Sequence, residues 1–397
     1  MIRKLSNLCI LCILSFCSFG EPLFAQNLDQ LRQTALRIGK LFGPKPYSSP
    51  PSWSKPNTPP LFSFAWLSDM HLDEANQQRM AQTLSWIDQH LKPTFLLLTG
   101  DNNAIVPVPA PTDPALRDFR RQQYLQQWLG EHWKRPYVII PGDNWPGGFD
   151  RVFGPRQYRV ECGGLHLVML APDVLHHGPG MEGLSAFDPE TLDWLCKDLD
   201  KYRDHPTLVA IHEPIYPPTF LDAPKLRKLI QAAPQVLGVL QGHLHIDMEL
   251  RDGKQTYLVD PAAGPGQPPA FKQVLVYRHA LILRTAELDP QTGQWSLTVK
   301  WQKIDIPEPL QKSLQPVGQE SKQTGNPSAD ATIWPGREKP LQIVSSRPPR
   351  PVRDEPALAR RAGELMEMVR QFLWKESPRL LMPSAERKRL PILRFPK

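Results

Sequence analysis

The chain has 397 residues, of which 41% are hydrophobic and 22% are charged. These shares are ordinary for a globular protein and exclude a chain that is disordered throughout. The 45 prolines are about twice the usual share, so part of the chain is linker or tail. A multi-span membrane protein is also excluded, because the only strongly apolar run, near Leu8–Phe19, is too short to span a bilayer comfortably.

The net charge of +7 is concentrated at the C-terminal end of the chain. Residues 337–397 contain 15 lysines and arginines against 7 acidic residues, so the rest of the chain is nearly neutral. The positive charge therefore says nothing about the substrate of the main domain. The basic tail suits an anionic partner, such as a cell-wall polymer, a lipid headgroup or nucleic acid. The alternative is a solvated extension without a partner.

The first 25 residues have the pattern of a secretory signal peptide, and the alternative is a buried helix. Two basic residues precede the apolar run, and Ala25 offers a small residue before a cleavage point at Gln26. We therefore expect export to the periplasm or the extracellular space, with no integral membrane span after signal removal. Export would leave two of the five cysteines, Cys162 and Cys196, as one disulfide or as two free thiols.

The middle of the chain alternates between apolar strands and helices. Strands are predicted at Phe62–Leu67, Phe95–Leu98, Tyr137–Ile140, Tyr158–Val160, His166–Leu170, Thr207–Ile211 and Val236–Leu240. Helices are predicted at Glu74–Leu91, Asp113–His132, Pro189–Tyr202 and Ala223–Ala232. From Asp247 to Lys303 the pattern becomes strand after strand. This order predicts an α/β domain in which helices cover a sheet, and further antiparallel strands extend it.

Both ends of the chain are predicted to lie outside this domain. Asn27–Gly43 has the spacing of a short amphipathic helix, and Pro44–Pro60 is a stiff linker with seven prolines. One more amphipathic helix is predicted at Glu355–Glu376. The predicted organisation is a signal peptide at 1–25, a short helix and linker at 26–60, a main domain at 61–305, a proline-rich linker at 306–352 and a basic helix and tail at 353–397.

Five of the predicted strands end abruptly at short polar runs rich in His and Asp. The runs are Ser68-Asp69-Met70-His71, Thr99-Gly100-Asp101-Asn102, Pro141-Gly142-Asp143-Asn144, His212-Glu213-Pro214 and Gln241-Gly242-His243-Leu244-His245. One such run is weak evidence, since a lone His after a strand is more often a hydrogen-bonded core or surface residue. Five runs are strong evidence, because ligands of open α/β sheets bind at the carboxyl ends of the strands.

The runs contain three carboxylates and four imidazoles that are candidate metal ligands. They are Asp69, His71, Asp101, Asp143, His212, His243 and His245. Such nitrogen and oxygen donors suit zinc, iron, manganese or similar ions. Seven ligands exceed the needs of one tetrahedral site and fit two ions that share a carboxylate. The sequence therefore predicts a dinuclear metal centre.

The ordered runs resemble the calcineurin-like metallophosphoesterase superfamily, whose pattern is D-x-H, G-D, G-N-H-[DE], H and G-H-x-H. The resemblance spans about Leu61 to Lys303, and Phe153-Gly154-Pro155 is similar to the phosphodiesterase and purple-acid-phosphatase-like branches. It implies an αββα sandwich of two mixed β-sheets flanked by helices. It also implies a metal-dependent hydrolase of phosphomono- or phosphodiesters, with a small-molecule or polymer substrate.

The resemblance also implies how the ligands are shared between two ions of manganese, iron or zinc. Asp101 would bridge both ions. The two remaining sets would be Asp69, His71 and His245 for one ion, and Asp143, His212 and His243 for the other. A metal-bound hydroxide would then attack phosphorus in line.

The third run departs from the family pattern. Asp143 takes the place of the metal-binding asparagine, and its carboxylate can still ligate. Asn144 takes the place of the histidine that contacts the phosphate and assists the leaving group. An amide can donate a hydrogen bond but cannot deliver a proton near neutral pH. Ala104 replaces the acid that supports this histidine in the protein-phosphatase branch. In an alternative register, Asn144 is itself the ligand.

Several consequences of this departure are open. His176 or His177 serves as the acid, unless both are solvated loop histidines. Alternatively, substrates with good leaving groups, such as aryl phosphodiesters or phosphoanhydrides, need no acid. In a third reading the site binds metal but is slow or inert, and the protein binds phosphorylated ligands or a partner. In a fourth, function lies mainly in the basic tail and the domain is a scaffold.

Overall fold

A computed structural model of the protein describes residues 41–176, 184–266, 268–317, 361, 363–365 and 367–372. The predicted signal peptide, most of the predicted second linker and the last 25 residues of the basic tail lie outside the described residues. Within the described residues, no helix combines the length and the apolar character needed to cross a membrane.

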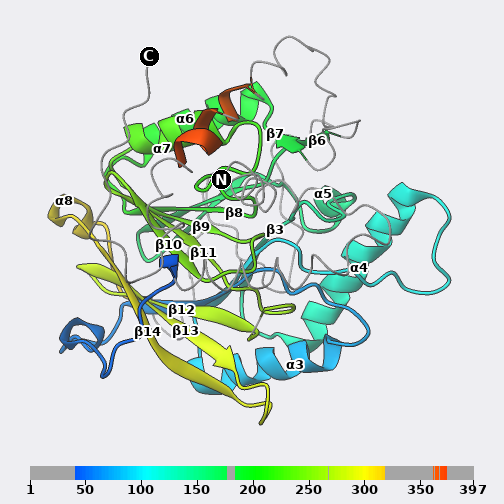
Figure 1. Cartoon of the computed structure of the whole chain (residues 1–397), viewed down its shortest axis with the longest axis horizontal. Coiled ribbons are helices and arrows are strands. Elements are labelled where there is room, and N and C mark those ends of the chain that lie inside the picture. The colour runs from blue at the N-terminus through cyan, green and yellow to red at the C-terminus, as the bar shows by residue number, and fades with distance from the viewer. Residues whose placement is uncertain are drawn as a thin grey trace, which may run out of the picture.

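Two six-stranded mixed sheets pack face to face between two layers of helices (Figure 1). The first sheet has the order β14-β13-β12-β1-β2-β3, and the second has the order β10-β11-β9-β8-β5-β4. Helices α3 and α4 cover the first sheet, and α6 and α7 cover the second. The predicted sandwich of two mixed sheets flanked by helices is confirmed.

The described elements follow the predicted order closely. The first sheet consists of β1 (Phe62–Leu67), β2 (Phe95–Thr99), β3 (Tyr137–Ile140), β12 (Ala270–Val276), β13 (Ala280–Leu288) and β14 (Trp295–Asp305). The second consists of β4 (Tyr158–Cys162), β5 (Leu165–Leu170), β8 (Thr207–Ile211), β9 (Val236–Gln241), β10 (Met248–Asp252) and β11 (Gln255–Val259). The helices are α3 (Gln77–Trp86), α4 (Pro114–His132), α5 (Phe149–Val152), α6 (Pro189–Lys201), α7 (Ala223–Ala232) and α8 (Glu308–Gln311). The hairpin β6 (Val174–His176) and β7 (Leu184–Ala186), together with α5 and α8, was not predicted.

The strands that precede the polar runs are parallel within each sheet. β1, β2 and β3 run parallel in the first sheet, and β8 and β9 run parallel in the second. Every residue of β2, β8 and β9 is buried, which is why these strands read as unbroken apolar runs. Because the strands are parallel, their carboxyl ends lie at the same edge of each sheet.

Three apolar clusters hold the layers together. One lies between the two sheets, a second between the first sheet and α3 and α4, and a third between the second sheet and α6 and α7. Each fully buried aliphatic or aromatic side chain contributes about 1.5–3 kcal/mol of transfer free energy to folding. The fold therefore depends on three separate apolar layers, and the strands that precede the polar runs contribute residues to all three.

The helix predicted at Glu74–Leu91 begins three residues late because its N-terminal residues form a polar turn. Asn76 N donates to Asp73 Oδ1 at 2.7 Å, and Asp73 N donates to Asn76 Oδ1 at 3.0 Å. Gln77 N also donates to Asp73 O at 3.0 Å, so the chain turns here, and the regular helix α3 starts after this turn at Gln77. It continues as a single π-type turn over Ile87–Leu91. α4 has a standard start, because the Asp113 side chain accepts from Ala115 N at 2.9 Å.

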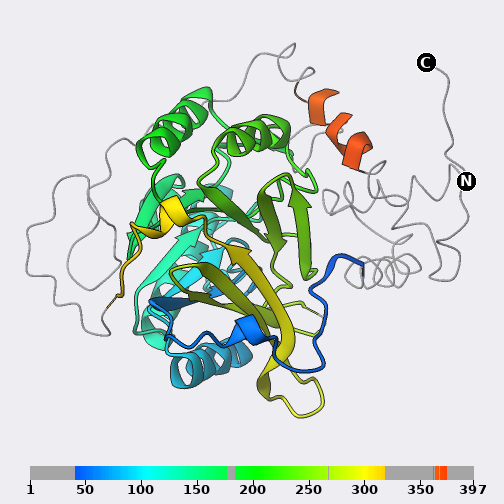
Figure 2. The ribbon, with the colours of Figure 1, turned by 90° about the vertical axis from the view of Figure 1, so that its left-hand side faces the viewer.

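Segments outside the core strands also pack against the domain. The described beginning of the predicted second linker forms α8, and Leu310 and Leu314 are buried between the sheets. Near the C-terminus, described helical residues of the segment 361–372 lie beside α7 (Figure 2). Phe372 of that segment contacts the ring of Tyr216, with ring centroids 5.0 Å apart. The cysteines left open by the sequence, one buried in β4 and one exposed in α6, are both free thiols.

Leu314→Ala tests whether residues after β14 belong to the folded domain. We expect a loss of about 2–4 kcal/mol in the free energy of unfolding, because Leu314 is buried and its truncation leaves a cavity. Chemical denaturation of the full chain measures the change. Lys312→Ala, two residues away and exposed, is the matched control and should change stability by less than about 0.5 kcal/mol. Equal stability of both variants would show that this segment does not hold the core.

Candidate metal centre

The structure brings all seven predicted ligand side chains to one place, where the strand ends of both sheets meet. Asp69 and His71 follow β1, Asp101 follows β2, Asp143 follows β3, His212 follows β8, and His243 and His245 follow β9. Their donor atoms form three overlapping groups, each within 4.8 Å. Two sheets therefore contribute to one site, with three carboxylates from the first sheet and three of the four imidazoles from the second.

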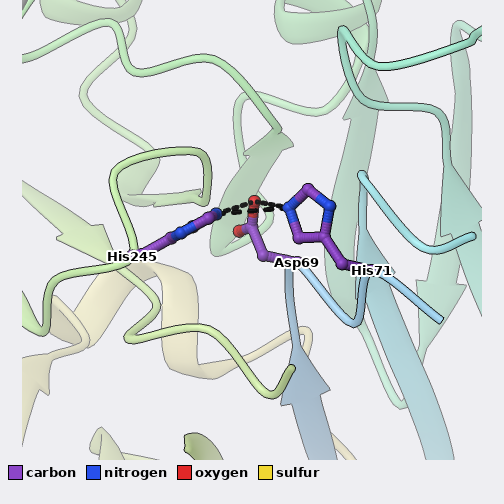
Figure 3. Close-up of side chains that lie close together, drawn as sticks. All are labelled: Asp69, His71 and His245. Atoms are coloured by element: carbon purple, nitrogen blue, oxygen red, sulfur yellow. Dashed lines mark hydrogen bonds and ion pairs between the residues drawn. The ribbon is translucent and has the colours of Figure 1, made fainter. Parts of the chain in front are cut away.

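The first group consists of Asp69, His71 and His245 (Figure 3). Asp69 Oδ1 lies 3.1 Å from His245 Nε2 and 3.7 Å from His71 Nε2. The two imidazole nitrogens face one another at 3.3 Å. The other carboxylate oxygen of Asp69 accepts from the backbone N of His243 at 2.9 Å, which ties this group to the second one.

The second group consists of Asp143, His212 and His243. Asp143 Oδ1 lies 3.0 Å from His212 Nε2 and 3.0 Å from His243 Nδ1. His212 is completely buried, whereas the carboxylate of Asp143 is partly exposed. This group therefore has one open side, toward the solvent.

Asp101 lies between the two groups. Its Oδ2 is 3.4 Å from His212 Nε2 and 3.6 Å from His71 Nε2. Asp69 Oδ1 also approaches an imidazole of each group, at 3.7 Å from His71 Nε2 and 3.8 Å from His212 Nε2, but Asp101 lies closer to both. The position is the one that the resemblance implies for a bridging carboxylate.

The charges of this site strongly shift the titration of its members. Burial opposes ionisation of Asp69, but His212 and His245 outweigh it and hold the pKa of this carboxyl well below its usual range. Burial likewise opposes protonation of His212, yet Asp101 and Asp69 raise its pKa well above the usual value. For His243 the effect of Asp143 exceeds that of burial and raises the pKa to about 9. The three carboxylates therefore strongly favour a positive charge in the space between them.

The donors fit a bound metal ion. His212 Nδ1 lies 2.8 Å from the carbonyl oxygen of Thr99, which can only accept, so Nδ1 carries the proton. In the neutral ring the lone pair of Nε2 then points toward carboxylate oxygens, an arrangement that a cation between them would relieve. Among the described residues, no lysine or arginine forms an ion pair with Asp69, Asp101 or Asp143. The cluster therefore contains the ligands of a metal site, and within the described residues only histidines can balance the charge of its carboxylates.

Comparison with known proteins agrees with this arrangement. Residues 62–247, which include every one of the seven donors, match the model of the calcineurin-like phosphoesterase family. This segment, just under half of the chain, is therefore similar to the calcineurin-like phosphoesterase family. No curated protein matches the chain.

Several solved structures are similar to the chain at low sequence identity. A dimetal phosphatase from Danio rerio is 12% identical over 62% of this chain and 100% of that chain, with a TM-score of 0.47. GAP50, the anchor in the inner membrane complex of Plasmodium, is 15% identical over 68% of this chain and 99% of that chain, with a TM-score of 0.43. Vps29 complexed with zinc, from Entamoeba histolytica, is 13% identical over 61% and 98%, with a TM-score of 0.29.

Five of the seven donor residues have a left-handed backbone. Their φ angles lie between 39° and 70°, at Asp69, His71, Asp101, His243 and His245. Residues other than glycine rarely adopt this conformation, and each costs about 1–3 kcal/mol unless the surroundings impose it. Such strain is typical of functional sites, and here it turns the side chains of two sheets toward one point.

The strand-end turns approach each other so closely that three of them require glycine, at Gly100, Gly142 and Gly242. A Cβ on Gly142 would overlap the Asp101 carboxylate, and a Cβ on Gly100 would lie 2.6 Å from the His212 ring. Gly100 also has a φ of 101°, which disfavours any L side chain. The glycines of these runs are therefore needed for the donors to meet.

The segment after β11 is hydrogen-bonded to the turn that contains Asp69. The sequence patterns did not predict this contact. Asp260 Oδ1 accepts from Ser68 N at 3.3 Å, and Gly264 N donates to Asp69 O at 3.0 Å. Burial raises the pKa of Asp260 well above its usual range. Glu213, which follows His212, is a second buried carboxyl for which no role was predicted. Burial, with Asp143 adding to it, raises the pKa of Glu213 to about 7.

Asn144 takes the place of the histidine in the family pattern, and His176 and His177 are the two candidate acids. Asn144 is exposed and binds Asp101 twice, through its backbone N to Oδ1 at 3.0 Å and through its side-chain amide to Oδ2. His176 ends β6, and its side chain lies outside what the structure describes, as does His177 altogether. The role of either histidine therefore stays a prediction.

Gly142→Ala should prevent the domain from holding its full metal complement. The added methyl group displaces the Asp101 carboxylate, so we expect metal affinity to fall by at least about tenfold, the loss typical of a disturbed ligand environment. Gly130→Ala, in α4, is the same chemical change with no atom within 4 Å and should be neutral or stabilising. Metal content after reconstitution with manganese, read alongside circular dichroism, measures both. A folded Gly142→Ala protein with wild-type metal affinity would contradict the crowded geometry.

Proposed function

We propose that the protein is an exported, metal-dependent phosphoesterase that hydrolyses phosphomono- or phosphodiesters at a dinuclear centre. The observation that carries this proposal is the arrangement of seven donors in two groups with Asp101 between them. Two groups that share a carboxylate suit two ions better than one. Similarity to the calcineurin-like phosphoesterase family supports the reaction class.

The chain's own residues prepare the site for such a reaction. Asp69, His71 and His245 would hold one ion, and Asp143, His212 and His243 the other, with Asp101 shared. When bound, two ions of manganese, iron or zinc would activate water and neutralise charge on the phosphoryl oxygens. His212 is held in one tautomer and orientation by Thr99 O. The left-handed turns fix five of the six remaining donors, all except Asp143, before any ion arrives.

Asn144 cannot perform the proton transfer that a histidine at its position would supply. Its amide binds Asp101 and so orients the carboxylate proposed to be shared. The leaving group would therefore depart without protonation from this residue, which favours esters of acidic alcohols, aryl esters and phosphoanhydrides. We propose a substrate of this kind, either a small molecule or a polymer.

The cellular location of the protein and the role of its basic tail are further parts of this proposal. The predicted signal peptide supports a periplasmic or extracellular phosphoesterase, and the basic tail suits an anionic partner near that site of action. A second candidate function is favoured by the contacts of Asn144, whose amide is already engaged with Asp101. In this alternative the protein is a catalytically weakened relative that binds phosphorylated ligands.

Asp101→Asn should abolish hydrolysis by the metal-reconstituted protein. We expect the rate with bis-p-nitrophenyl phosphate to fall roughly 10²-fold or more, since the variant removes the charge shared by both donor groups. Removal of metal with a chelator should have the same effect and be reversed by manganese, iron or zinc. Asp200→Asn, at a surface carboxylate paired with Arg203, is the matched control and should keep full activity. Turnover that survives in Asp101→Asn would rule out this centre as the source of activity.

Asn144→His should restore a proton donor and separate the two candidate functions. We expect an increase of about tenfold or more for phenyl phosphodiesters, because phenolate gains more from protonation than p-nitrophenolate does, within the usual range of acid catalysis. Esters of p-nitrophenol should gain much less. Rates for both esters at several pH values measure the difference. An equal gain for both esters would mean that the change acts on Asp101 and not on the leaving group, and binding without turnover in either protein would favour the weakened relative.

A further inference from the structure

Trp145 is an exposed aromatic residue directly beside the metal centre, and the proposed chemistry makes no use of it. It follows Asp143 and Asn144, and 39% of its surface is exposed. Its Cα lies at most about 7 Å from that of Asp143, because only one residue separates them. Large apolar side chains with this exposure are few in the described part of the protein. Burying such a ring is favourable, so an indole that is exposed beside the donor cluster is available to pack against a ligand.

The backbone at Trp145 is held in an unfavourable conformation. Its φ is 50°, a left-handed value that is a genuine outlier for a bulky residue. Two contacts impose it: the buried side chain of Gln122 donates to Trp145 O at 3.0 Å, and Asn144 N donates to Asp101 Oδ1 at 3.0 Å. Strain of this kind persists where surrounding structure fixes it, and it gathers at ligand-binding positions. Trp145 is therefore fixed relative to Asp101.

Arg121, in α4, supports the indole ring from one side. Its guanidinium carbon lies 4.4 Å from the ring centroid, within the range of a cation–π contact. Asp118 pairs with this guanidinium, and Ala104 O accepts from its Nε at 3.3 Å. Arg121 is thus anchored to α4 and to the turn that carries Asp101. The neighbouring carboxylate also neutralises its charge, so the surface offered to a ligand is aromatic and not cationic.

We propose that Trp145, supported by Arg121, is a platform that stacks on the planar aromatic group of the substrate, either an aryl group esterified to the phosphate or the base of a nucleoside phosphoester. This inference rests on the proposed phosphoesterase function and deepens it by naming the substrate class, aryl or nucleoside phosphoesters. Stacking on a fixed ring orients the planar group at little cost in side-chain entropy. Aryl groups are also good leaving groups, which agrees with a site in which Asn144 cannot donate a proton.

The binding test compares phenyl phosphate with methyl phosphate on the full, manganese-loaded protein by isothermal titration calorimetry. We expect the phenyl compound to bind about tenfold more tightly, as one stacked ring contributes. Trp145→Leu, which keeps the Cβ and the backbone constraint, should remove this preference, and Trp145→Phe should keep most of it. Tyr47→Leu is the control, since Tyr47 has nearly the same exposure and lies against β14. Equal affinities in the wild type, or an unchanged preference in Trp145→Leu, would overturn the platform.

The affinity for adenosine monophosphate distinguishes the two kinds of planar group, a nucleobase and a simple aryl ring. Tighter binding than phenyl phosphate, lost in Trp145→Leu, would assign a nucleobase to the platform. Binding no tighter than that of phenyl phosphate would assign a simple aryl group.

Turnover separates this inference from the proposed function. Methyl phenyl phosphate and methyl hexafluoroisopropyl phosphate have leaving groups of comparable acidity, but only one is planar. We expect Trp145→Leu to lower kcat/KM for the phenyl ester about tenfold and to leave the alkyl ester unchanged. If neither ester is hydrolysed while the binding preference holds, the hydrolase proposal fails and the platform stands. If both esters are hydrolysed and the variant slows them equally, the hydrolase stands and the platform fails.

Discussion

The metal centre depends on a steric constraint: strand-end turns from two sheets meet with no room for one additional carbon atom. Gly142 lies against the Asp101 carboxylate, and Gly100 lies against the His212 ring. The first contact is made within one sheet, and the second connects the two sheets. Because protein interiors are close-packed, neither turn can retreat without disturbing the apolar layers behind it. The packing of the two sheets therefore determines the geometry of the seven donors.

The same crowding explains why the donor residues tolerate an unfavourable backbone. Five left-handed residues in one site would cost several kcal/mol if each costs about 1–3 kcal/mol on its own. Hydrogen bonds between turns offset this cost, such as His71 N to Asp101 O at 2.8 Å and Gly264 N to Asp69 O at 3.0 Å. The donors are consequently positioned by backbone contacts, and not by the metal alone. A site built in this way loses little freedom when a ligand binds.

The sequence predicted the parts of this structure that local patterns determine. Strands such as β2 and β9 are apolar up to their last residue, so their ends and the polar residues after them could be placed to within one residue. The late start of α3 depends on a side-chain turn at Asp73, which periodicity does not reveal. The hydrogen bond to Asp260 could not be seen either, because it joins residues 192 positions apart. Proline-rich composition predicted a linker after residue 305, although Leu314 is spaced four residues after Leu310 and both are buried.

The third strand-end run shows how one short segment can change both chemistry and recognition. Asp143 and Asn144 add a carboxylate and an amide, and both contact other members of the donor set. Trp145 then replaces a charged position of the family pattern with an aromatic ring supported by Arg121. A site without a proton donor at Asn144 works best on groups that leave as stable anions, and planar aromatic alcohols are such groups. The loss of acid catalysis and the gain of an aromatic surface therefore favour the same substrates, and the two changes in this run are better understood together than apart.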